Sequence, residues 1–253
     1  ESLLKTVEAL VIACEQAADK EREAINLFSI EDDGEPYSVE EYTAGKPIEG
    51  EVMRIMTVDR QQAGFWVEVR AWTAEPASWQ LWFGKIDTID MVRAIQIKYG
   101  VPDQCCAQDR RYQPSAVDAD CVRFGWRGIM GYKRKSWTMK NEGTNQLENY
   151  PHSDPRFSAV GGNLSAPYYE ISTYHMKDLV ANAVSGDGIK WRQPVDGNPI
   201  YAEHLAAEEK REVRPGVWEW IEVKQNHNHG FDCSVMQTAV AVIAGMVHCR
   251  VAE

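Results

Sequence analysis

The sequence lacks the cysteine spacing, signal peptide and long apolar run that are typical of zinc-binding, secreted or membrane-spanning proteins. Its six cysteines form no CxxC pair and no zinc-ligand spacing, which favours a reduced cytosolic setting over a disulfide framework. There is no signal peptide and no apolar run of about 18 residues, so neither secretion nor membrane insertion is supported. Cations are also few, since 27 Lys and Arg stand against 38 Asp and Glu, for a formal net charge of −11. That balance argues against a protein that coats nucleic acid over its whole surface, but it suits a carboxylate site that a divalent metal neutralises.

Length and composition predict one large domain with an extension. The chain has 253 residues, of which 44% are hydrophobic, enough to bury a sizeable core. Residues 2–28 place apolar side chains at helical spacing, which predicts an amphipathic helix, and a polar Gly- and Pro-containing stretch follows. The first residue is Glu1 rather than methionine, which suggests a piece of a longer polypeptide. We therefore expect an N-terminal helix and linker over residues 1–50 and the main domain over residues 51–253.

From residue 51 the pattern changes to that of a sheet. EVMRIMTVD and FWVEVRAWTA are predicted strands joined by a turn at RQQAG, and WQLWFGKI is a predicted third strand. A helix over TIDMVRAIQIKYG and a short buried strand in PDQCCAQD follow. This β-β-β-α-β order, with Asp59 and Asp109 at the ends of the first and fourth strands, is that of the ribonuclease H-like core. The predicted fold class is therefore α/β, a ribonuclease H-like mixed sheet flanked by helices, with an N-terminal helical extension.

Further elements are predicted around a long insertion. RRYQPSAVDADCVRFG predicts a loop and a helix, and WRGIMGYKRKSW a strand leading into a basic turn. The polar segment from Thr138 to about Pro167 is predicted to be an exposed insertion rather than core. Beyond it we expect a strand at YYEIST, helices at YHMKDLVANAVSG and IYAEHLAAEEKREV, a strand at VWEWIEV, and a closing helix after NHNHGFDC.

Three aspartates form a candidate catalytic and metal-binding set. Asp59 and Asp109 lie 50 positions apart (109 − 59), and Asp232 lies 123 further on (232 − 109). Carboxylates at two strand ends and a helix start can converge on two Mg²⁺ or Mn²⁺ ions about 3.5–4 Å apart, the arrangement that phosphodiester hydrolysis needs. In the structural alternative, Asp59 starts a turn, Asp109 lies on the surface and Asp232 is a helix N-cap.

The stretch NHNHGFDC, residues 226–233, carries the third acid. His227 and His229 could ligate a metal, but an i, i+2 pair before a helix is more often engaged in loop hydrogen bonds. We expect Asn228 or His229 to orient the Asp232 carboxylate, and Glu68 is a further candidate for such support near Asp59. A zinc site is disfavoured, because zinc needs about four converging ligands.

Basic side chains gather after the second acid, between residues 110 and 140. A basic turn beside a tryptophan can bind DNA phosphates, although a solvated turn is the common role of such a run. The predicted DNA-binding residues are Arg110, Arg111, Lys133, Arg134 and Lys135.

The order of these segments resembles the nuclease domain of tailed-phage terminase large subunits, in the branch typified by lambda's packaging enzyme. TVDRQQAGFWVEVRAW followed by SWQLWFG resembles the start of that domain, and CAQDRRYQPSAVDADCVRF its second-acid strand. WRGIMGYK resembles its next strand. ISTYHMKDLVANAVSG, YAEHLAAEE and NHGFDCSVMQTAVAVIAG resemble its distal helices and last acid motif. The resemblance covers roughly Val52 to Met246.

This resemblance implies a metal-dependent endonuclease that cuts double-stranded viral DNA during genome packaging in the host bacterial cytoplasm. It implies two divalent ions, Mg²⁺ or Mn²⁺, held by the three aspartates. The implied partners are DNA, the terminase ATPase domain, the small terminase subunit and the portal, with no membrane. The ATPase loop GxxxxGK[ST] is missing from this sequence, so residues 1–50 would lead from an absent ATPase domain. Two alternatives remain open: a Holliday-junction resolvase or transposase-type ribonuclease H-like enzyme, and a catalytically silent docking domain of the packaging motor.

Overall fold

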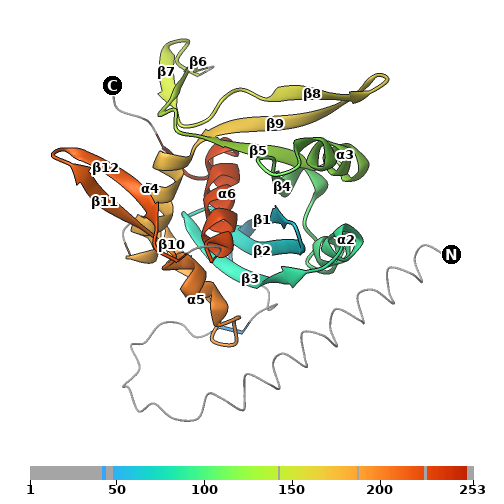
Figure 1. Ribbon diagram of the computed structural model, residues 1–253, viewed down its shortest axis with the longest axis horizontal. Helices are drawn as coiled ribbons and strands as arrows, with labels where there is room; N and C mark the ends of the chain where they lie inside the picture. Colours follow the sequence, from blue (N-terminus) through green and yellow to red (C-terminus); the bar gives the residue numbers. More distant parts are fainter. Residues whose placement is uncertain (1–41, 44–47, 142, 187, 225–226, 250–253) are drawn as a thin grey trace.

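The structure is a computed structural model that describes residues 42–43, 48–141, 143–186, 188–224 and 227–249 (Figure 1). The amphipathic helix expected over residues 2–28 lies outside the described residues, as does most of the predicted extension over residues 1–50. None of the helices in these described ranges is long and apolar enough to cross a membrane.

An eight-stranded mixed sheet forms the centre of the molecule, in the order β10-β3-β2-β1-β4-β5-β9-β8. Three strands form an antiparallel meander, as their alternating apolar residues predict: β1 (Glu51–Gln61), β2 (Gly64–Thr73) and β3 (Ala77–Ile86). On the other side of β1, two shorter strands pair in parallel: β4 (Cys106–Asp109) and β5 (Arg127–Tyr132). The order 3-2-1-4-5 of these five strands is that of the ribonuclease H-like core, and the predicted fold class is confirmed.

Helices cover both faces of this sheet (Figure 1). On one face α2 (Ile89–Lys98) and α3 (Pro114–Phe124) pack against apolar side chains of β1 and β2, and Thr88 caps the start of α2. On the other face lie α4 (Thr173–Val184) and α6 (His229–Ile243), and the short α5 (Ile200–Leu205) contacts α6. Successive side chains of a strand point to opposite faces. Met56 and Val58 of β1 therefore meet α2 and α3, whereas Ile55, Thr57 and Asp59 face α6.

The predicted insertion is more ordered than its composition indicates. A separate hairpin forms from β6 (Trp137–Lys140) and β7 (Leu147–Tyr150). The following β8 (Arg156–Gly161) and β9 (Leu164–Ser172) pair with each other, and β9 joins β5, so both extend the main sheet. Most residues of the segment are exposed or half-buried, as predicted, but the addition of β8 and β9 to the edge of the main sheet was not predicted.

The helix predicted for IYAEHLAAEEKREV forms only in its first part. α5 ends at Leu205, and the residues expected to continue it form β11 (Glu208–Arg214), which pairs antiparallel with β12 (Val217–Glu222). Cross-strand pairing here outweighs the helix propensity of the Glu- and Lys-rich stretch. Two more short elements, outside the insertion and β11, were also not predicted: the 3₁₀ helix η1 (Asp103–Cys105) and β10 (Lys190–Arg192), which pairs with β3.

Candidate active site

Asp59 and Asp109 lie at the ends of neighbouring parallel strands. Val58 of β1 is opposite Gln108 of β4, so the next residue on each strand is an aspartate. Paired residues of β1 and β4 are thus 50 positions apart in the sequence, as Asp59 and Asp109 are. Asp59 is buried and Asp109 half-buried, and both continue the rows of side chains that face α6.

Asp232 approaches the same sheet edge from α6. The helix begins at His229 with Asn228 as its N-cap, so Asp232 lies in the first turn and not at the cap itself. Its backbone N–H donates to the carbonyl of Asn228, 2.9 Å away, and the Nδ2 of Asn228 lies 3.2 Å from its Oδ2. Asn228 thus contacts the carboxylate that the sequence analysis expected it to orient.

The charge of Asp59 acts on the other two aspartates. Burial raises the pKa of Asp109 to about 6; the hydrogen bond from the backbone of Arg111 opposes the rise, and the charge of Asp59 adds to it. Burial likewise raises the pKa of Asp232 well above its usual range, and the charge of Asp59 is the next largest cause. A nearby like charge disfavours the ionised form of a carboxyl group, so these effects are consistent with a shared acidic site.

This donor set fits a divalent cation. Among the described residues, no three His, Cys, Asp or Glu side chains are grouped closely enough to hold an ion as they stand. The three aspartates nevertheless offer only carboxylate oxygens, the ligands that Mg²⁺ and Mn²⁺ prefer. Because the charge of Asp59 helps to raise the pKa of both Asp109 and Asp232, a bound cation would remove an electrostatic cost that the protein alone leaves in place.

Two side chains hold the Asp59 carboxylate. Gln61 follows at i+2 on the same face of β1, and its Nε2 lies 2.8 Å from both carboxylate oxygens. The Nδ1 of His229 lies 2.8 Å from Oδ2. His229 therefore contacts Asp59, whereas the sequence analysis paired it with Asp232. Gln61 was not among the predicted site residues, although its i+2 spacing from Asp59 on a strand was a usable signal.

Aromatic rings fix the position of His229. Trp66 stacks on its imidazole with ring centroids 5.8 Å apart, and His204 meets it edge-on at the same distance. The backbone N–H of Gly230 donates to Nδ1 of His204 over 3.0 Å. A Cβ at Gly230 would come within 2.9 Å of the Cβ of His204, so glycine is needed for this close approach. The pKa of His204 is lowered to about 4, chiefly by burial and then by the charges of His229 and His227.

The residues of NHNHGFDC diverge in a way that disfavours a shared zinc ion. His227 is exposed, His229 is bonded to Asp59, and the thiol of buried Cys233 points to the carbonyl of Trp66 at 3.6 Å. Burial also raises the pKa of Cys233 well above its usual value, which disfavours the thiolate that zinc requires.

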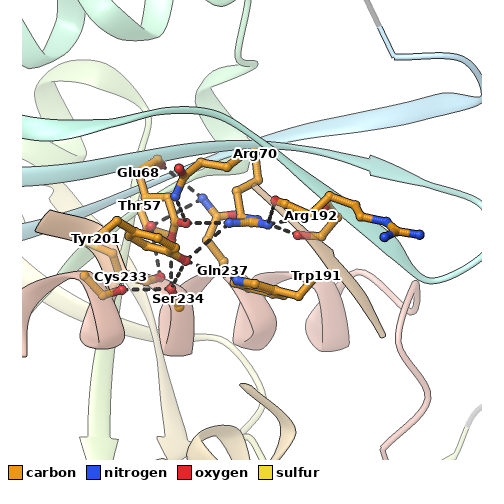
Figure 2. A network of polar contacts seen from close by, with 12 residues as sticks. Thr57, Glu68, Arg70, Trp191, Arg192, Tyr201, Cys233, Ser234 and Gln237 are labelled. Atoms are coloured by element: carbon orange, nitrogen blue, oxygen red, sulfur yellow. Dashed lines mark hydrogen bonds and ion pairs between the residues drawn. The ribbon is translucent and has the colours of Figure 1, made fainter. Parts of the chain in front are cut away.

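Glu68 lies in a polar network between the sheet and α6 (Figure 2). It is fully buried, and its carboxylate accepts hydrogen bonds from Arg70 at 2.8 Å, Gln80 at 3.0 Å and Ser234 at 3.1 Å. None of these described contacts reaches Asp59, so Glu68 anchors the helix that carries Asp232. Figure 2 shows the wider network, which includes Thr57, Tyr201, Trp191, Arg192 and Gln237.

The predicted DNA-binding residues separate into two groups. Arg110 is half-buried and forms two hydrogen bonds with Asp118 of α3, at 2.6 and 2.8 Å, while its guanidinium lies over the ring of Tyr168. The ion pair between Arg110 and Asp118 therefore holds α3 against the sheet. The others are exposed: Arg111 directly after β4, and Lys133, Arg134 and Lys135 directly after β5.

Comparisons with known proteins relate this chain to a family of nuclease domains. The family model described as "Terminase large subunit gpA, endonuclease domain" matches residues 123–251, a stretch that contains Asp232 and its neighbours. A solved structure of the human cytomegalovirus terminase nuclease domain is similar at 10% sequence identity and a TM-score of 0.40, covering 79% of this chain and 88% of that chain. The search of curated proteins gave no match.

Proposed function

Because the chain belongs to the family of terminase large subunit gpA endonuclease domains, we propose that it cuts double-stranded viral DNA during genome packaging. The observation that carries this proposal is the placement of Asp59 and Asp109 near the ends of the paired strands β1 and β4, with their charges acting on Asp232 in the first turn of α6. We assign Asp59, Asp109 and Asp232 as the ligands of two divalent ions, Mg²⁺ or Mn²⁺.

Two such ions would activate a water molecule and stabilise the leaving oxygen of an in-line displacement at phosphorus. The protein's own contribution is to hold the ligands. Gln61 and His229 donate to Asp59 and fix the plane of its carboxylate. An ionised carboxylate can only accept, so the proton shared with His229 lies on Nδ1. Cys233 is buried with a raised pKa, so no thiolate nucleophile is offered beside the acids.

Substrate binding is assigned to the exposed cations at the same edge of the sheet. Arg111 follows β4, which pairs in parallel with β1, and Lys133, Arg134 and Lys135 follow β5, which pairs in parallel with β4. We propose that these four side chains contact DNA phosphates, which concentrates positive charge locally on a protein whose net charge is −11. Arg110 supports them indirectly through its ion pair with Asp118.

The packaging role adds further partners. We propose that this domain works beside the terminase ATPase domain, the small terminase subunit and the portal in the host bacterial cytoplasm.

Incubation of the protein with supercoiled plasmid tests the proposed activity. We expect linear DNA to form with Mn²⁺ or Mg²⁺ and no cutting in EDTA. A four-way junction with arms of matched sequence serves as a second substrate. Strong preference for the junction would favour a resolvase, and folded protein that cuts neither substrate would favour a docking role.

A further inference from the structure

A buried ion pair lies directly behind Asp232. Lys177 of α4 pairs with Glu208 at the start of β11, and the two side chains are only 15% and 4% exposed. The ammonium of Lys177 also lies 5.6 Å from the centre of the Phe231 ring. Phe231 immediately precedes Asp232, so the pair joins α4 and β11 to the helical turn that carries the third acid.

Glu208 reaches Asp232 through one amide. Its Oε2 is bonded to Lys177, and its Oε1 accepts a hydrogen bond from Nδ2 of Asn228 over 2.9 Å. The same nitrogen lies 3.2 Å from Oδ2 of Asp232. An amide nitrogen carries two N–H groups, so it can serve both carboxylates at once. The bond to Glu208 therefore determines how Asn228 presents its second N–H to Asp232.

Lys177 makes this arrangement stable. Glu208 is buried, and a buried carboxylate that loses its ion partner is strongly unfavourable. Without Lys177, the Glu208 side chain would turn toward water and release Asn228. With Lys177 in place, Glu208 stays buried as a fixed acceptor. The amide of Asn228 then stays directed at Oδ2 of Asp232.

We propose that Lys177 and Glu208 are positioning residues of the nuclease site, which hold Asn228 so that its amide fixes Asp232 for metal binding. The inference rests on the proposed function. It adds to the site two residues that do not contact the metal ions, on two elements, α4 and β11, that carry none of the three aspartates.

The same two elements provide a matched control. Lys210 of β11 pairs with Asp178 of α4, one residue along from Lys177, with Nζ 2.8 Å from Oδ2. Asp178 also accepts a hydrogen bond from Trp220 of β12. Removing Lys210 therefore weakens the contact between α4 and β11 without altering Glu208 or Asn228.

The test compares Lys177→Met with Lys210→Met in two measurements: calorimetric titration of Mn²⁺ and plasmid cleavage over a range of Mn²⁺ concentrations. We expect Lys177→Met to weaken Mn²⁺ binding about 10- to 100-fold, with cleavage shifted to correspondingly higher Mn²⁺, as is typical when support for a metal ligand is removed. Lys210→Met should remain close to wild type in both. Lys177→Arg keeps the charge and should retain most of the Mn²⁺ affinity.

A second variant keeps the test decisive if Lys177→Met does not fold. Lys177→Met/Glu208→Leu has no unpaired buried charge but lacks the acceptor for Asn228, so it should fold and still bind Mn²⁺ weakly. Wild-type Mn²⁺ affinity in that double variant, or equal behaviour of Lys177→Met and Lys210→Met, would overturn the inference while leaving the nuclease intact. Wild-type protein that neither binds Mn²⁺ nor cuts DNA would remove the proposed function itself, and the inference with it.

Discussion

Replacing Arg70 by methionine should lower the free energy of unfolding by about 3–5 kcal/mol, because it leaves the Glu68 carboxylate buried without its ion partner. Both side chains are fully buried, with Nη1 of Arg70 2.8 Å from Oε1 of Glu68. Arg70 also donates to the carbonyl of Arg192 at 2.6 Å and to Oγ of Ser78 at 2.5 Å. Its guanidinium lies 3.9 Å from the centre of the Trp191 ring. These contacts leave water no access to either charge.

Urea denaturation followed by circular dichroism measures this loss directly. In a domain of this size each kcal/mol corresponds to about 2–4 °C in Tm, so a parallel thermal scan should show a fall of about 6–20 °C. Glu68→Gln/Arg70→Met carries no buried charge and should recover on the order of 2 kcal/mol relative to Arg70→Met. A loss below about 1 kcal/mol for Arg70→Met, the range of exposed ion pairs, would refute the reasoning.

Three further predictions concern the site. Changing residues 133–135 to Ala should weaken DNA binding and reduce its dependence on salt in fluorescence-anisotropy titrations; an unchanged affinity and salt slope would make this a solvated turn. Metal analysis of purified protein should find no EDTA-resistant zinc, and stoichiometric zinc lost on His227→Ala would show a structural zinc site. Asp109→Asn should stabilise the metal-free protein at neutral pH. The pKa of Asp109 is raised from 3.8 to about 6, so the wild type loses stability as pH rises between those values. Denaturation curves should show the advantage of Asp109→Asn disappearing below about pH 4, and equal stability of the two proteins at neutral pH would contradict this prediction.

The sheet and its acids could be predicted because their signals are local. The alternating apolar residues of β1 to β3 and the capped helix α2 were legible as patterns, and the positions of Asp59 and Asp109 at strand ends followed from them. The common register of the two aspartates depends on the parallel pairing of β1 with β4, which the ribonuclease H-like strand order predicts.

Other features depend on contacts between distant parts of the chain. His229 contacts Asp59 across 170 positions, and no local pattern near either residue specifies that pairing. The strand β11 has the composition of a helix, and only its pairing with β12 makes it extended. Glu68 looked like an active-site neighbour because it follows Asp59 across a hairpin. Its side chain is instead turned toward Arg70 and Ser234. The contact with Ser234 depends on the packing of α6 on the sheet, which no local pattern specifies.

The most direct measurement of the assigned site is plasmid cleavage in Mn²⁺ by the wild type and by Asp59→Asn, run side by side. We predict that the wild type produces linear DNA and that Asp59→Asn is slower by orders of magnitude, because an amide binds hard cations poorly. Matching circular dichroism spectra and unfolding midpoints would show that the fold is intact in both. Undiminished cutting by Asp59→Asn, or cutting by the wild type in EDTA, would contradict a metal-dependent nuclease built on this carboxylate.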